Sequence, residues 1–240
     1  MSDPAFYGDT WAPIYDEVFA HLDPTAAVEA LAQLAGTGRA LELGIGTGRV
    51  AIPLAARGVA VHGIEASQAM VDRTRAKPGG ATIPVTLGDF AQVAVEGEYA
   101  LIYVVFSTLY GLPTQSAQLA CLRNAAARLA PGGLFVFEGF VPDPTRFDGN
   151  QRVQVNRVDP TRLDLLFARH DPVHQRVTSQ HVIAGPEGMR LFPVEVRYVW
   201  PSELDLMGQL AGLRLRERWG DWRRGPYTGS GGHVSIYERT

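Results

Sequence analysis

Apolar residues along this chain alternate between two spacings. Apolar-rich segments predict strands over residues 39–43, 58–64, 82–87, 99–106 and 134–140, and the continuous apolar run 99–106 is typical of a strand buried on both faces. Between these segments, apolar positions at helical spacing predict helices over residues 49–57, 67–77 and 114–130. Strands that alternate with helices in this way predict an α/β fold, a doubly wound, Rossmann-like parallel sheet with helices on both faces.

Two local signals refine the ends of these elements. Asp23 followed by Pro24 is an N-cap with proline at the first helical position, which predicts a helix that reaches about Ala35. Residues 6–21, ahead of it, are rich in aromatic side chains and are expected to form a partly helical cap. Pro-Gly-Gly at residues 131–133 is predicted as the turn that precedes the fifth strand.

The pattern changes after Pro142. Short runs with alternating polarity, separated by turn residues, predict an antiparallel meander with strands over residues 152–158, 162–168, 176–183 and 189–200. We expect this insertion, residues 146–199, to act as a lid or as a dimer contact, outside a core of residues 1–145 and 200–240.

The α/β pattern resumes after the insertion. Ser202 is predicted to cap a helix that ends near Ala211. Two further strands, over residues 213–219 and 234–238, are expected to form a hairpin at the sheet edge around the loop 220–232. With them the predicted sheet has seven strands.

Composition narrows the function. Apolar residues make up 46% of the 240 positions and the formal net charge is −3, which argues against a nucleic-acid binder that neutralises phosphates. No apolar run has membrane-spanning length, and the first residues lack the basic and apolar regions of a signal peptide. Cys121 is the single cysteine, so no intrachain disulfide forms, as is usual in a reducing cytoplasm. We expect a cytoplasmic protein with a small-molecule partner.

A glycine-rich turn follows the first predicted strand. Gly44, Gly46 and Gly48 alternate, and glycine lets a backbone approach a ligand closely because it accepts positive φ. Arg49 stands where a dinucleotide-binding G-x-G-x-x-G motif has its third glycine. Glu42, two residues before the turn, suits the ammonium group of an amino acid better than a pyrophosphate.

Further candidates lie where the other strands end, which is the edge at which open α/β sheets bind ligands. Glu65 ends the second strand and can accept both hydroxyls of a ribose. Asp89 and Phe90 follow the third strand, where an acid can take an adenine amino group beside an aromatic ring. Phe106 and Ser107 end the fourth strand.

The E-x-G-x-G-x-G run at residues 42–48 resembles the first motif of class I S-adenosylmethionine-dependent methyltransferases. The insertion after strand five, the N-terminal Tyr-Asp element and the Phe-Ser-Thr at residues 106–108 resemble those that dimethylate amino sugars. The resemblance implies S-adenosylmethionine as the methyl donor and no metal. It also implies a set of donor-binding residues: Tyr15, Glu42, Gly44, Gly46, Gly48, Ile64, Glu65, Met70, Asp89, Phe90, Phe106 and Ser107.

Four side chains are candidates for the chemistry of methyl transfer. Tyr7 and Tyr15 keep the spacing of two tyrosines that flank the methyl donor in that group, where they would orient the acceptor. Glu138, near the end of strand five, could hold an amine or accept a proton, and His233 is a candidate base ahead of the last strand. The acceptor atom is expected to be a nitrogen or oxygen, with carbon third, in a small metabolite of natural-product type.

Two alternatives stay open at this stage: a nicotinamide-dependent oxidoreductase that uses the glycine turn and Glu65, and a non-catalytic protein that binds S-adenosylmethionine. Other features are interpreted as structural. His170, Asp171 and His174 are expected in an exposed turn, and the arginines of residues 214–224 on solvated strand faces. Cys121 is expected in the core.

Overall fold

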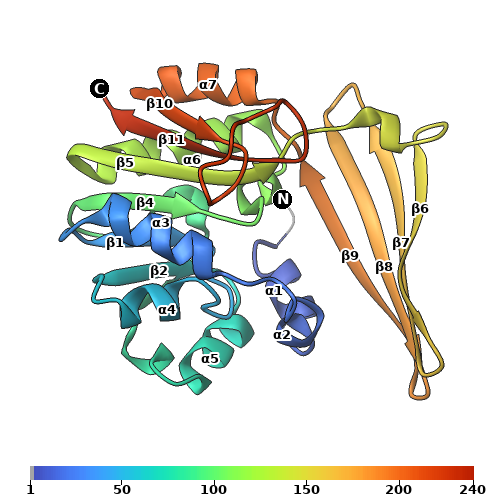
Figure 1. The fold of residues 1–240 in the computed structure, drawn as a ribbon. Coiled ribbons are helices and arrows are strands. Elements are labelled where there is room, and N and C mark those ends of the chain that lie inside the picture. Colours follow the sequence, from blue (N-terminus) through green and yellow to red (C-terminus); the bar gives the residue numbers. More distant parts are fainter. Residues whose placement is uncertain (1–2) are drawn as a thin grey trace.

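The computed structural model describes residues 3–240 and places a seven-stranded sheet at the centre of the molecule (Figure 1). The strand order is β10-β11-β5-β4-β1-β2-β3. The pairs among β1 to β5 are parallel, whereas β11 runs antiparallel to both β5 and β10. The strands span Ala40–Leu43 (β1), Val61–Glu65 (β2), Val85–Leu87 (β3), Tyr99–Val104 (β4), Leu129–Phe140 (β5), Leu213–Trp219 (β10) and Gly232–Arg239 (β11).

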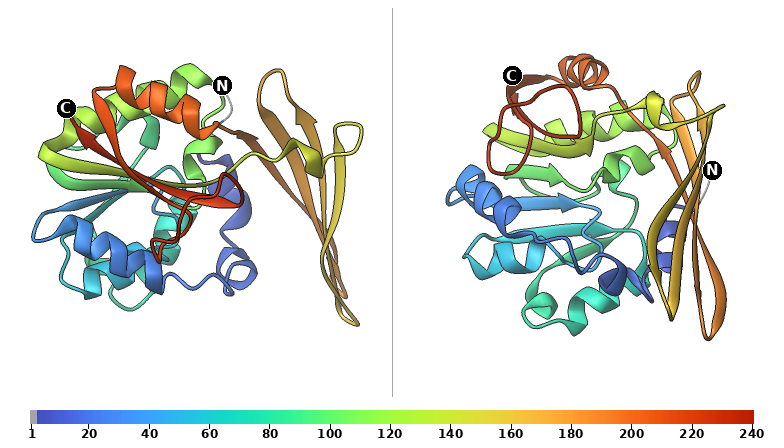
Figure 2. Two further views of the ribbon diagram at one scale, coloured as in Figure 1. Left: turned by 45° about the horizontal axis from the view of Figure 1, so that its top comes forward. Right: turned by 45° about the vertical axis from the view of Figure 1, so that its right-hand side comes forward.

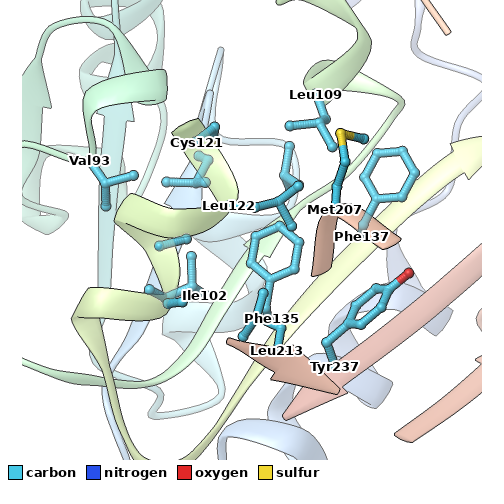
Figure 3. Close-up of a cluster of buried hydrophobic side chains, with 14 of the residues drawn as sticks. Val93, Ile102, Leu109, Cys121, Leu122, Phe135, Phe137, Met207, Leu213 and Tyr237 are labelled. Atoms are coloured by element: carbon cyan, nitrogen blue, oxygen red, sulfur yellow. The ribbon is translucent and has the colours of Figure 1, made fainter. Parts of the chain in front are cut away.

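Helices cover both faces of this sheet (Figures 1 and 2). On one face α6 and α7 enclose an apolar cluster that includes Cys121, Phe135 and Tyr237 (Figure 3). On the other face Leu31 of α3 and Leu54 of α4 pack into a second cluster. The helices span Phe6–Trp11 (α1), Tyr15–Val18 (α2), Thr25–Ala35 (α3), Ala51–Ala56 (α4), Gln68–Ala76 (α5), Gln115–Arg128 (α6) and Pro201–Leu210 (α7). The predicted doubly wound architecture is confirmed, with Cys121 in its core.

A second sheet of four strands follows β5, in the order β6-β7-β8-β9. Every neighbouring pair is antiparallel, as the alternating pattern predicted. The sheet stands beside α1 and α2, and the β6–β7 and β8–β9 turns reach away from the connection to the core (Figure 1). Its strands span Gln151–Asp159 (β6), Arg162–Asp171 (β7), Arg176–Gly185 (β8) and Gly188–Arg197 (β9).

The second sheet is attached at two places. Trp11 of α1 is 1% exposed and its ring lies 4.9 Å from that of Phe192 and 5.1 Å from that of His181. Near the connection to α7, buried Arg197 donates to Glu203 at 2.7 Å and to Gln118 at 2.6 Å. The sheet is therefore held by the N-terminal cap at one place and by α6 and α7 at the other.

Two predicted boundaries are wrong. Helix α6 stops at Arg128 and β5 begins at Leu129, so residues 131–133 interrupt a strand instead of preceding it. Tyr99 of β4 pairs with Leu129 of β5, but Leu101 pairs with Leu134, so the register shifts across this interruption. Gly132, within it, has a φ of 73°. Ser202 is no cap, because α7 already begins at Pro201, whose restricted φ suits the first helical position.

Two predictions about exposure are also wrong. His170 is 7% exposed, because it lies in β7 and bonds through Nε2 to the Tyr198 hydroxyl at 2.9 Å. Arg218 is largely buried and donates to Asp205 of α7 at 2.5 Å. The partner of His170 follows β9 and that of Arg218 lies on the preceding helix, and local polarity patterns reveal neither pairing.

Candidate active site

The glycine turn between β1 and α4 needs glycine for two different reasons. Gly44, Gly46 and Gly48 all have positive φ, between 58° and 76°. A Cβ on Gly44 would stand 2.6 Å from the Thr108 side chain, so this position also lacks space. In front of Gly46, by contrast, nothing lies within 4 Å of where a Cβ would be, so the turn presents open backbone there.

Glu65 ends β2 and faces this turn. Its Oε2 accepts from the Gly46 amide at 2.9 Å and its Oε1 accepts from the Ser67 amide at 3.0 Å. Burial raises the pKa of the carboxyl, while these backbone bonds oppose the shift. A carboxylate offers about four lone-pair directions, so acceptor capacity remains for a ligand.

Glu42 and Arg49 lie on either side of the turn. Glu42 is 2% exposed, and burial raises its pKa to about 8 although Tyr103 donates to Oε2 at 3.0 Å. Glu42 is therefore predominantly protonated at neutral pH. The guanidinium of Arg49 stacks on the Phe106 ring at 5.3 Å and is close enough to affect the pKa of both Glu42 and Tyr15.

The N-terminal helices are bonded to the glycine turn and to the start of α5. The Asp16 carboxylate accepts from the Thr47 hydroxyl at 2.6 Å and from the Lys77 ammonium at 2.7 Å. Asp9 accepts from the Ser67 hydroxyl at 2.6 Å. These bonds fix the position of α1 and α2 over the carboxyl ends of β1 and β2.

Tyr7 and Tyr15 are brought together by this attachment. Burial raises the pKa of Tyr15 to about 12 and that of Tyr7 well above its usual value, with a contribution from the nearby Glu65 in each case. Both phenols therefore stay protonated at neutral pH. They can orient a ligand by hydrogen bonds, but they cannot act as bases.

A strained turn follows β4. Phe106 and Ser107 have φ values of 55° and 59°, which is uncommon for residues other than glycine and marks strain. Glu138 stabilises this turn, because its Oε2 accepts from the Phe106 amide at 2.8 Å and its carbonyl accepts from the Ser107 amide at 3.0 Å. The strain positions the Phe106 ring against Phe19 of the cap at 5.2 Å.

The remaining predicted donor-binding residues differ in what they contribute. Asp89 accepts from the Ala91 amide at 2.8 Å, and Phe90 lies beside the Cβ position of Gly44. Ile64 is buried, and its carbonyl accepts from the turn amides of residues 44 and 45. Met70 is 2% exposed and packs against Trp11, so the structure places its side chain under α1.

His233 lies apart from this group. It is 1% exposed, bonds through Nδ1 to the Ser235 hydroxyl at 2.8 Å and packs against the Phe137 ring. Burial lowers its pKa to about 4, so the imidazole is neutral. The structure thus groups Tyr7, Tyr15 and Glu65 with the glycine turn and leaves His233 between the sheet and its helices.

Several site residues were not expected from the sequence. Asp16, Thr47 and Lys77 form the attachment of the cap, and Thr74 donates to the Gly46 carbonyl at 2.7 Å. Arg49 was noticed only as a departure from the dinucleotide motif. Its position directly after a glycine turn was a signal for an anion contact.

Residues 3–240 contain no group of three or more His, Cys, Asp or Glu side chains that converge as metal ligands. Across the same described residues, no helix combines the length and apolar character needed to cross a membrane.

Comparison with known proteins agrees with this geometry. Residues 40–133 match a family model described as a methyltransferase domain. The CcbJ methyltransferase of Streptomyces caelestis, a solved structure, is 37% identical, has a TM-score of 0.92 and aligns over 99% of each chain. The cypemycin N-terminal methyltransferase of a Streptomyces species is 27% identical over 95% of each chain. An S-adenosylmethionine-dependent methyltransferase of Clostridium acetobutylicum shares the fold, with a TM-score of 0.81 at 13% identity over 96% of this chain and 98% of that one.

Proposed function

We propose that this chain, which belongs to the class I S-adenosylmethionine-dependent methyltransferases, methylates a nitrogen of a small metabolite. The observation that carries the proposal is geometric: Tyr7 and Tyr15 are held beside the glycine turn, while Glu138, the predicted acid, accepts from the Phe106 amide at 2.8 Å. Because the chain belongs to this family, we no longer consider the alternative of a nicotinamide-dependent oxidoreductase. Oxygen is the second candidate for the methyl-accepting atom, and carbon is the third.

The residues present fit S-adenosylmethionine. The open space in front of Gly46 gives room at the turn, and Glu65 keeps free acceptor positions for ribose hydroxyls. Arg49 suits the carboxylate of the methionine part, and Asp89 with Phe90 suits the adenine. Bound S-adenosylmethionine supplies a methyl group on a sulfonium, already activated for transfer to a nucleophile.

The side chains of this protein then orient the acceptor and do not transfer a proton. The Tyr7 and Tyr15 oxygens accept from an amine N–H and so aim its lone pair, and positioning of this kind can lower a barrier by about 7–11 kcal/mol. A neutral amine needs no base, whereas an alcohol does. Glu138, the acid predicted for proton transfer, is engaged with the Phe106 amide at 2.8 Å. These facts favour nitrogen over oxygen.

An acceptor screen tests the proposal. The purified chain is first titrated by calorimetry with S-adenosylhomocysteine, with NADH as the control. Matched primary amines and alcohols with the same carbon skeleton are then assayed for methylated product by mass spectrometry. Turnover of amines alone is expected. Turnover of alcohols alone would assign oxygen, and binding of NADH without S-adenosylhomocysteine would contradict the whole proposal.

Partner and location follow from other features. The face of the second sheet that points away from α1 exposes Val153, Val155, Val158, Met189 and Leu191, each by more than half of its surface. A second copy of the chain is the proposed cover for this apolar face. The buried, reduced Cys121 is consistent with the cytoplasm as the proposed location.

A further inference from the structure

A cavity of about 250 Å³ lies between the inner face of the second sheet and the segment that connects this sheet to β5. Its walls are mostly apolar, with Phe140 and Pro142 on the connecting side and Val177, Val194 and Val196 on the strands. This volume is below the roughly 300–1,000 Å³ of typical ligand pockets, so it suits one part of a small molecule.

The cavity borders the proposed methyl-transfer site. Val194 lines the cavity and, like Tyr15, packs against the cluster around Trp11. Phe140, on the opposite wall, donates its amide to Ser107 of the strained turn at 3.2 Å. A molecule that reaches Tyr15 can therefore extend into this cavity.

Two arginines without acidic partners stand at the cavity. Arg152 of β6 is half-buried, and its one side-chain hydrogen bond among the described residues goes to Gln154. Arg146 of the connecting segment lies near enough to lower the pKa of Arg152, after the larger effect of burial. Neither guanidinium has a carboxylate within 4.0 Å in the part of the chain that the structure describes.

The acid beside them is already engaged. Asp143 accepts from the Thr145 amide at 3.1 Å and from the Thr145 hydroxyl at 2.5 Å, so it caps the short 3-10 helix η4, Pro144–Arg146. His170 and Tyr198 also line the cavity, and they are hydrogen-bonded to each other at 2.9 Å. Asp143 is close enough to oppose the pKa shift of Arg152, so two arginines stand against one acid and the cavity keeps a net positive charge, with no ion pair to either guanidinium among residues 3–240.

We propose that this cavity binds the end of the acceptor remote from the methylated atom, and that this end is an apolar group carrying an oxyanion, a carboxylate or a phosphate. The planar guanidinium groups of Arg146 and Arg152 match such an anion with paired N–H donors. The inference rests on the proposed methyltransferase function for the link to the acceptor, whereas anion binding itself can be measured without turnover.

The test uses three probes with one phenyl group each: 3-phenylpropionate, phenyl phosphate and neutral 3-phenylpropionamide. Their affinities for the full chain, saturated with S-adenosylhomocysteine, are measured by ligand-observed NMR. At least one anion is expected to bind about tenfold more tightly than the amide, in line with a charge-assisted hydrogen bond. Whichever anion binds more tightly identifies the group.

Variants locate the effect. Arg152→Gln removes the charge but keeps a polar side chain, and it is expected to bring the affinities of the anions to within about twofold of that of the amide, while Arg152→Lys keeps part of the preference. Arg169→Gln is the matched control, because it removes one charge from the exposed, opposite face of the same sheet. Equal binding of anions and amide by the unmodified chain would overturn the proposal, as would a preference that survives in Arg146→Gln/Arg152→Gln.

The two proposals fail separately. If the unmodified chain does not bind S-adenosylhomocysteine, the proposed methyltransferase site is contradicted, but the preference for anions can still be measured. Retained binding of S-adenosylhomocysteine without an anion preference would contradict the cavity assignment alone.

Discussion

Glu65 is the acid in the candidate site that keeps hydrogen-bond acceptor positions for a ligand. Its two oxygens hold the Gly46 and Ser67 amides, and the carboxylate still faces the open side of the turn. We predict that Glu65→Ala weakens S-adenosylhomocysteine binding about tenfold to a hundredfold, because charged hydrogen bonds contribute about 1.5–3 kcal/mol each. Calorimetric titration measures this change. Glu96→Ala, which removes an exposed acid far from the turn, is the control, and equal affinities in the two variants would remove Glu65 from the donor site.

Glu138 offers a choice between chemistry and support. If its role is to hold the strained turn, Glu138→Gln keeps an oxygen for the Phe106 amide and should retain most of kcat, while Glu138→Ala should lose it. A catalytic base would lose activity in both variants. The kcat values of the two variants, compared with that of the unmodified chain, distinguish these roles. Their pH–rate profiles give a second readout, because loss of a supporting residue leaves the apparent pKa values of the profile unchanged.

Glu42 links pH to stability. Its pKa in the folded chain, about 8, lies above the ordinary value of 4.5, so the folded state holds a proton that the unfolded state releases between these values. Stability is thus lost as pH rises through this window, by at most about 1.4 kcal/mol per pH unit. We predict that Glu42→Gln is more stable than the unmodified chain at pH 8 and similar at pH 4.5. Urea unfolding at both pH values checks this, and a difference independent of pH would contradict it.

At the scale of elements, the attachment of α1 and α2 decides whether the tyrosines reach the site. We predict that Asp16→Ala, which removes the bonds to Thr47 and Lys77, costs about 1–2 kcal/mol of cap attachment and lowers S-adenosylhomocysteine affinity about tenfold. Limited proteolysis should then cut before residue 23 more rapidly. Glu17→Ala, one residue along, removes a bond to Arg162 of the second sheet and should leave the affinity within about twofold.

The same scale shows what sequence patterns can and cannot reveal. The strands, the meander and the glycine turn were predictable because each depends on spacing within a short segment. The partners of Asp16 and Glu138 were not, since each lies on an element far along the chain. The partner of Arg218 was not either, because the spacing within a strand does not show which residue of the preceding helix faces it. His170 was misjudged because its partner Tyr198 lies 28 positions along the chain, directly after β9.

At the scale of the whole molecule, the apolar outer face of the second sheet predicts association. Val155→Glu with Leu191→Glu places charge on exposed positions of β6 and β9, the two edge strands of this sheet, and should convert a dimer into a monomer in sedimentation experiments. Val173→Glu is the control, since Val173 is 82% exposed in a turn. A monomeric unmodified chain would contradict the proposed second copy.

The position of β11 has a consequence for the order of folding. This strand lies between β5 and β10, so Glu138 pairs with Val234 although the entire second sheet separates them in the chain. The four strands of that sheet pair with their immediate successors, and such local contacts form fast, whereas distant pairings form slowly. We therefore expect the second sheet to assemble while β5 is still an open edge. The slow phase of refolding should report the arrival of β11.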